Sequence, residues 1–122
     1  MPELDDILKQ ARAVGNLIAT LPAVSLYFEA ARRIESDAGA RQLLSDYQRE
    51  AQALREREMS GRPVEVADKQ RFAAIESRVA GHELVKAFSR AQADYVEVMD
   101  RVTRAMHEPL AKVAEQAHEN SR

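Results

Sequence analysis

Apolar residues recur at helical spacing along almost the whole chain, and this periodicity is what most constrains the fold. Side chains three and four residues apart share one face of a helix, whereas a half-buried strand needs strict alternation. No segment shows a convincing strand pattern. We therefore predict an all-α protein. The first apolar face consists of Leu4, Ile7, Leu8, Ala11, Val14, Ile18 and Leu21.

Proline and capping residues divide the first half of the chain into three helices. Pro22 ends the first helix and begins the second, because the fixed backbone of proline suits the first helical turn. Ser36 and Asp37 then offer side-chain oxygens as N-caps. These caps predict a long third helix over residues 37–59.

The second half of the chain begins at the break formed by Ser60–Pro63. A fourth helix is expected over residues 65–80, with Gly81 as its C-cap. A second long helix is expected over 82–107, where the apolar spacing comes close to a heptad seam. Pro109 should kink or end that helix.

The length of 122 residues fits one domain, which we predict to span residues 1–122. Its expected architecture is an antiparallel bundle of about five helices over residues 4–108. A kinked or partly disordered helical tail is expected over 109–122. Because 21 of the residues are alanine, the core should be thin, and we expect self-association to complete its burial.

The composition excludes several classes of site. Without cysteine the chain has no thiolate metal site, cysteine nucleophile or disulfide. The formal charge of -2 argues against non-specific nucleic-acid binding. Direct RNA binding by the arginines therefore stays a minor alternative to a protein partner. Neither a nucleotide-binding glycine pattern nor a serine nucleophile elbow occurs. The acidic residues lie on the polar helix faces rather than in buried pairs, and we predict a protein without enzymatic activity or cofactor.

One alternative is a small bundle that binds a metal or ligand through its histidines. Glu115 and His118 have the spacing that brings two ligands to one point on a helix. A di-iron site requires a second such motif, which is absent, and surface histidines explain the pattern as well.

The longest uncharged stretch covers residues 13–28 and is interrupted by Pro22. It is shorter than the roughly 20 apolar residues that a membrane-spanning helix needs. A buried corner between two helices explains it better. We expect no membrane insertion and, from the acidic start of the sequence, a cytoplasmic protein.

The apolar corner and the seam of the last helix are the candidate interface for a protein partner or a second copy, with a dimer as the first expectation. Aromatic residues with a polar edge are common at such interfaces. The candidate residues are Leu17, Ile18, Leu21, Val24, Tyr27, Phe28, Phe88, Tyr95 and Met99.

Two segments of the sequence carry a resemblance to a known family. One is the Asp-x-x-Ala-x-x-Leu-Leu-x-x-Tyr pattern at residues 37–47, and the other is the Met-x-Gly break at 59–61. Together with the order of the helices over about residues 4–108, they make the chain similar to the YlbF/YmcA family of small bacterial proteins. The chain departs from the family at Gly81-His82, where Asn-Pro is often found.

The resemblance implies an all-helical, non-enzymatic regulatory protein that commonly self-associates. The best-known members form a cytoplasmic complex that acts with a membrane-anchored endoribonuclease in messenger-RNA maturation. Some members carry an iron–sulfur cluster on cysteines, which this chain lacks. We therefore expect an adaptor without a cofactor whose partners include RNA-processing machinery.

Overall fold

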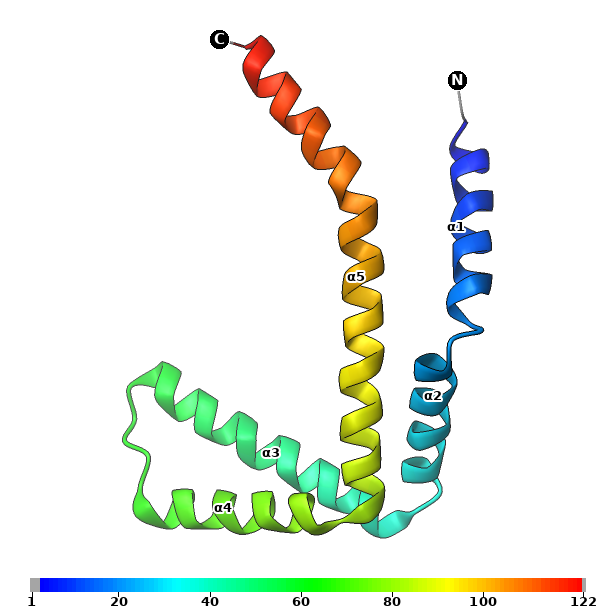
Figure 1. The fold of residues 1–122 in the computed structure, drawn as a ribbon. Helices are drawn as coiled ribbons and strands as arrows, with labels where there is room; N and C mark the ends of the chain where they lie inside the picture. The colour runs from blue at the N-terminus through cyan, green and yellow to red at the C-terminus, as the bar shows by residue number, and fades with distance from the viewer. Residues whose placement is uncertain (1–2, 122) are drawn as a thin grey trace.

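The structure, a computed structural model, describes residues 3–121, which form five helices and contain no strand (Figure 1). This confirms the all-α prediction and its two long helices. The ends of the predicted domain, residues 1–2 and 122, lie outside the described residues. The helices are α1 (Leu4–Ile18), α2 (Pro22–Glu35), α3 (Ala38–Ser60), α4 (Val66–Gly81) and α5 (Glu83–Asn120).

The predicted boundaries in the first half agree with the local hydrogen bonds. Pro22 is the first residue of α2, and the break before it bends the chain by 75° between the axes of α1 and α2. Asp37 caps α3, because its Oδ1 accepts a hydrogen bond from the Ala40 backbone N–H at 2.8 Å. The first three helices therefore begin and end within a residue or two of the positions predicted from proline and the capping residues.

Gly61 ends α3 in the left-handed conformation, with φ of 75°. The backbone N–H of Arg62 donates to the carbonyl of Arg57 at 2.9 Å, which closes the helix with a glycine C-cap. Gly81 was predicted to play the same role for α4, and this prediction is wrong. Gly81 is itself helical, and His82 follows in an extended conformation that serves as both the C-cap of α4 and the N-cap of α5. The chain turns there without needing a left-handed residue.

α5 is longer than predicted, because it does not end at Pro109. The helix continues to Asn120 and curves over its C-terminal part (Figure 1). The expected tail, as far as residue 121, is therefore mostly a continuation of α5. Proline removes one backbone donor and crowds the preceding turn, which can bend a helix without ending it.

The helices pack as two antiparallel pairs that meet at an elbow, which gives the molecule an L shape (Figure 1). One pair is α2 with α5, and the other is α3 with α4. At the elbow the buried core joins α2, α3 and α5 through Ile34, Ala40, Leu43 and Val85. Half-buried Ile75, Val79 and Phe88 pack around it. The core is thin, as predicted.

No single helix in residues 3–121 is both long enough and apolar enough to cross a membrane. α1 and α2 reach that length and composition only when taken together, as a pair with the 75° bend between them.

Candidate interaction surface

Four aromatic rings hold α2 against α5. Tyr27 stacks on Tyr95 with ring centroids 4.3 Å apart, and its ring lies 5.7 Å from that of Phe88. Phe28 meets Tyr95 edge-on at 5.9 Å. Such pairs contribute about 0.5–1.5 kcal/mol beyond the burial of their area. The sequence predicted these four residues as an interface, and three of them are half-buried in contacts within the chain, whereas Phe28 remains 57% exposed.

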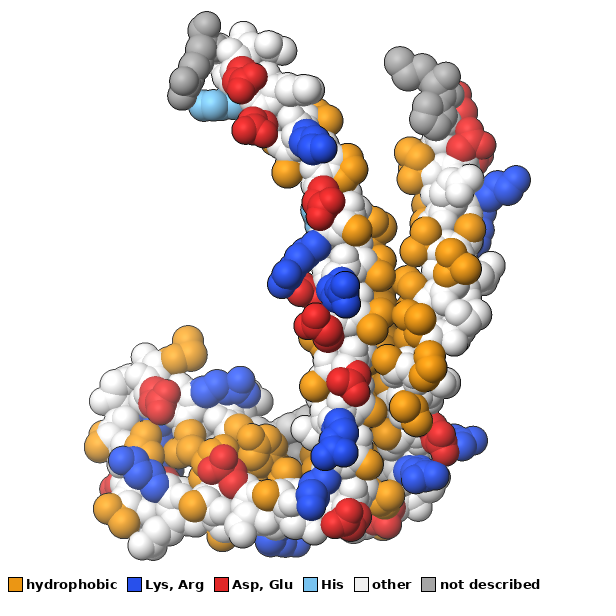
Figure 2. All heavy atoms as spheres, in the orientation of Figure 1, with side chains coloured by type: hydrophobic (Ala, Val, Ile, Leu, Met, Phe, Trp, Pro, Cys, Tyr) orange, Lys and Arg blue, Asp and Glu red, His pale blue; other side chains and the backbone are white. Residues whose placement is uncertain are grey.

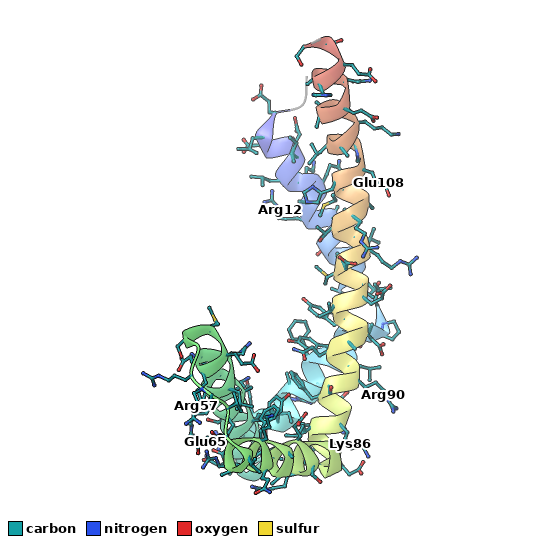
Figure 3. All side chains as sticks on the ribbon, turned by 90° about the vertical axis from the view of Figure 1, so that its left-hand side faces the viewer. Arg12, Arg57, Glu65, Lys86, Arg90 and Glu108 are labelled. Atoms are coloured by element: carbon teal, nitrogen blue, oxygen red, sulfur yellow. The ribbon has the colours of Figure 1, made fainter. Side chains whose placement is uncertain are left out.

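Beyond this cluster, α1 and the C-terminal half of α5 extend side by side and apart from the rest of the molecule (Figure 1). Figure 2 shows hydrophobic side chains on the sides of these two helices that face each other. In Figure 3, Arg12 on α1 and Glu108 on α5 lie in the same upper part of the molecule, which places the two helices alongside each other in a second view.

We call this pair of apolar faces the fork. Its base lies near Leu17 and Leu21, and its tip lies towards the two chain ends. Leu17 is 70% exposed and Leu110 is 60% exposed, although both occupy apolar helical positions. The large side chains of the fork are Leu4, Ile7, Leu8, Val14, Leu17 and Leu21 on one side and Met106, Leu110 and Val113 on the other.

The predicted interface residues divide between the fork and the interior. Leu17 and Leu21 belong to the fork, and half-buried Ile18 and Met99 lie near its base. Val24 is 8% exposed and lies among the core residues. The structure thus places the candidates in two settings, with Leu17 and Leu21 exposed at the fork and Val24 and Phe88 packed in the interior.

Sequence reasoning did not include the tip of the fork in the interface. The face of α1 was recognised, but it was assigned to the bundle core, and Leu110 and Val113 were assigned to a tail. One feature of the sequence could have indicated that this face is exposed. The helix is strongly amphipathic, and the chain has few bulky residues that could cover its apolar side.

A buried carboxylate in the α3–α4 pair was also missed. Asp68 is 8% exposed, although acidic residues were expected on polar faces. It forms ion pairs with Arg57 and, at 2.6 Å, with Arg71, whose guanidinium also lies 3.5 Å from Glu50. Its Oδ2 atom, which pairs with Arg57, also accepts a hydrogen bond from the Glu65 backbone N–H and so closes the first turn of α4. Asp68 therefore has a structural role, fastening α3 to α4.

A shallow groove of about 300 Å³ lies between α2 and α5. Small side chains such as Ala30 and Ala91 line it, and Leu26 is exposed at its edge. The ion pair between Glu29 and Arg33, at 3.0 Å, lies along its rim. This mixed, open lining does not supply the convergent polar groups of a substrate pocket.

The histidines that raised the metal-binding alternative are not gathered into one place. Within residues 3–121, no three His, Asp or Glu side chains are arranged to hold a metal ion. Glu115 and His118 lie near the end of α5, where all residues are exposed. No observation in the described part of the chain favours this alternative.

Comparisons with known proteins agree with the fold. A family model described as "Control of competence regulator ComK, YlbF/YmcA" matches residues 7–111. Among solved structures, the chain is similar to a chain in the X-ray crystal structure of Bacillus subtilis RicA in complex with RicF. That match has a TM-score of 0.70 and 13% sequence identity, and it covers 92% of this chain and 99% of the other. No curated protein matches the sequence.

Proposed function

The chain belongs to the YlbF/YmcA family, as the resemblance predicted, and we propose that it is a non-enzymatic adaptor that assembles with protein partners through the fork. The observation that carries the proposal is the exposure of nine large apolar side chains, eight of them on the two facing helices and Leu21 just after α1. Apolar side chains gathered in an exposed patch often mark an interaction site, whereas apolar side chains scattered singly over a surface do not.

The mechanism is burial of the fork against a complementary apolar surface. Its charged borders, with Arg12 and Glu108 as examples, set the orientation of the partner more than the affinity. The crystal structure of RicA in complex with RicF supports a protein as the partner, since it contains a chain with this fold.

We further propose that the assembly is cytoplasmic and that it includes RNA-processing machinery with an endoribonuclease. The support for this part is family membership alone. The balanced charge of the chain favours contact with the protein components of such machinery rather than with RNA.

Affinity capture from the native host tests the proposal. The wild-type chain should retain a defined set of proteins, including an endoribonuclease, as identified by mass spectrometry. Leu17→Glu places a charge at the base of the fork and should lose them. Leu26→Glu is the matched control, because Leu26 is 58% exposed but lies outside the fork. Capture of the same proteins by wild type and Leu17→Glu would contradict the proposal.

A further inference from the structure

The two apolar faces of the fork belong to one chain and are turned towards each other (Figure 2). We propose that the fork closes when no partner is bound: α1 swings about the joint at residues 19–21 and packs on the C-terminal half of α5. The closed fork hides the interaction surface, so that a partner has to bind the open state. The inference rests on the proposed function, because closure regulates the same surface.

The joint between α1 and α2 has the properties of a hinge. Residues 19–21 lie outside both helices, and the hydrogen bonds across them join residues at most four positions apart. The hydroxyl of Thr20, for example, donates to the carbonyl of Leu17 at 2.6 Å. Within residues 4–18, only Ile18 is half-buried, and the others are exposed. A change in a few backbone torsions at the joint therefore reorients α1 with little loss of packing.

The apolar stripes on the two helices match in length. Leu4 and Ile18 on α1 are fourteen residues apart, and so are Met99 and Val113 on α5. At 1.5 Å per residue, each stripe is about 21 Å long. The two helices run in opposite directions (Figure 1). Alignment of the two stripes at the base of the fork therefore also aligns them at its tip.

The positions between these ends match as well. Three further layers pair Val14 with Val102, Ala11 with Met106, and Ile7 with Leu110. Successive layers are three or four residues apart on both helices, which is the spacing of a coiled-coil seam. The small side chain of Ala11 faces the long side chain of Met106, and such complementary sizes favour close packing. The two stripes therefore form a continuous seam when the fork closes.

Closure removes exposed apolar side chains from water. Leu4 is 67% exposed, and Leu110 is 60% exposed. α1 has 15 residues with none buried, and helices of this length are marginal in water unless an apolar face is packed. The stripe on α5 is linked to α1 within one chain, which gives it a high effective concentration. Packing on α5 therefore stabilises α1 when no partner is present.

Leu17 lies outside the closing seam, although it belongs to the fork. It is one residue from Ile18 and therefore about 100° away round the helix. Its side chain is mostly exposed in the open fork and stays exposed when the seam forms. Substitutions at Leu17 thus report on the partner and not on closure, which separates the two proposals.

Disulfide trapping in the full-length chain tests closure, because the chain has no native cysteine. The double variant Ile7→Cys/Leu110→Cys carries one cysteine on each stripe, in the same layer. Closure brings the two Cα atoms within the roughly 7 Å that a disulfide allows. Mild oxidation of dilute protein should therefore give a disulfide within one chain of 13.7 kDa, which migrates faster than the reduced chain on a denaturing gel.

The matched control is Lys9→Cys/Glu108→Cys. Each of its cysteines is two residues, or about 200° round the helix, from its counterpart in the test pair, so both lie on outer faces at the same level. The control should form the one-chain disulfide at least about 10-fold more slowly than the test pair.

Two further variants of the test pair separate the seam from the rest of the fork. Adding Leu4→Glu should slow trapping by on the order of 10-fold, because closure would bury a carboxylate without a partner. Adding Leu17→Glu should leave the rate unchanged. Circular dichroism should show the same helix content in both variants, so that a slower rate reports on closure and not on unfolding.

Capture of proteins from the native host tests whether closure hides the surface. The oxidised test pair should retain about 10-fold less of the proteins that its own reduced form captures, because a chain held closed has a small binding-competent fraction. Reduction of the disulfide should restore capture. The reduced form is the matched reference, since it carries the same two substitutions.

A test pair that is trapped no faster than its control would overturn closure, and so would a product that has the mass of two chains. Equal capture by the oxidised and reduced forms would overturn the hiding of the surface. These results are separable from the proposed function. If capture depends on Leu17 but nothing is trapped, the adaptor stands without closure. If the disulfide forms but wild type captures nothing, the adaptor proposal and the regulatory role fail, while the closing motion stands.

Discussion

The elbow and the fork have the same sequence pattern but a different degree of burial. At the elbow, Leu43 is 4% exposed and Val85 is 3% exposed, because four helices converge on them. At the fork, Leu17 and Leu110 occupy equivalent amphipathic positions and stay mostly exposed. The difference shows that helical periodicity identifies an apolar face, whereas the number and placement of neighbouring helices determine whether the same chain covers it.

The largest effect is expected at the elbow. Leu43→Ala should lower the free energy of unfolding by about 2–5 kcal/mol, because it removes buried methyl groups and leaves a cavity. Urea denaturation followed by circular dichroism at low protein concentration measures this change. A loss below about 1 kcal/mol would mean that the elbow is not the stabilising core.

The second-largest effect is expected in the α3–α4 pair, where a substitution at Asp68 tests whether the pair depends on a polar contact for its stability. Asp68→Asn should lower the free energy of unfolding by about 1–3 kcal/mol, because the carboxylate between Arg57 and Arg71 loses its charge in a mostly buried site. Asp46→Asn is the control, because Asp46 pairs with Arg49, whose side chain is 70% exposed. The control should change stability by less than about 0.5 kcal/mol. Equal effects in the two variants would contradict the assigned role of Asp68.

A smaller effect on the free energy of unfolding should distinguish the two glycines at the C-terminal ends of α3 and α4. Gly61→Ala should lower the free energy of unfolding by about 1–2 kcal/mol, because φ of 75° is unfavourable for a residue with a Cβ. Gly81→Ala should be neutral or stabilising by up to about 1 kcal/mol, since a Cβ at this helical position meets no atom within 4 Å. Thermal unfolding of both variants checks the expected opposite signs. Destabilisation by Gly81→Ala would restore the C-cap role that the sequence predicted.

The smallest effect is expected at the fork and completes the comparison with Leu43. Leu17→Ala should change the stability of the monomer by less than about 0.5 kcal/mol, because the side chain is 70% exposed. Urea denaturation followed by circular dichroism at low protein concentration measures this change in stability. A large loss at low concentration would show that Leu17 packs on its own chain.

Local signals in the sequence predicted much of the fold. Pro22, Asp37 and Gly61 mark helix boundaries through short-range chemistry, and each does so in the structure. The prediction at Gly81 failed, because a helix can also end on an extended residue such as His82. The extent of α5 was underestimated, because neighbouring turns can support a helix past a proline.

The candidate surface was only partly predictable. The sequence identified Leu17 and Leu21 but could not separate them from buried Val24, since all three have apolar helical spacing. Whether they are covered depends on the 75° bend between α1 and α2, which directs α1 away from the packed region. Asp68 was missed for a similar reason, because its burial depends on arginines from two helices that tertiary structure brings together.

His82 is the whole connection between α4 and α5, because this single extended residue caps both helices. A one-residue insertion after it, if absorbed by α5, would rotate that helix by about 100° about its own axis. Tyr95 would turn away from Tyr27, and the apolar stripe at the fork would turn with it. Residues 62–64 lie outside the helices and cap neither of them, so the chain should tolerate changes in length there far better than at this joint.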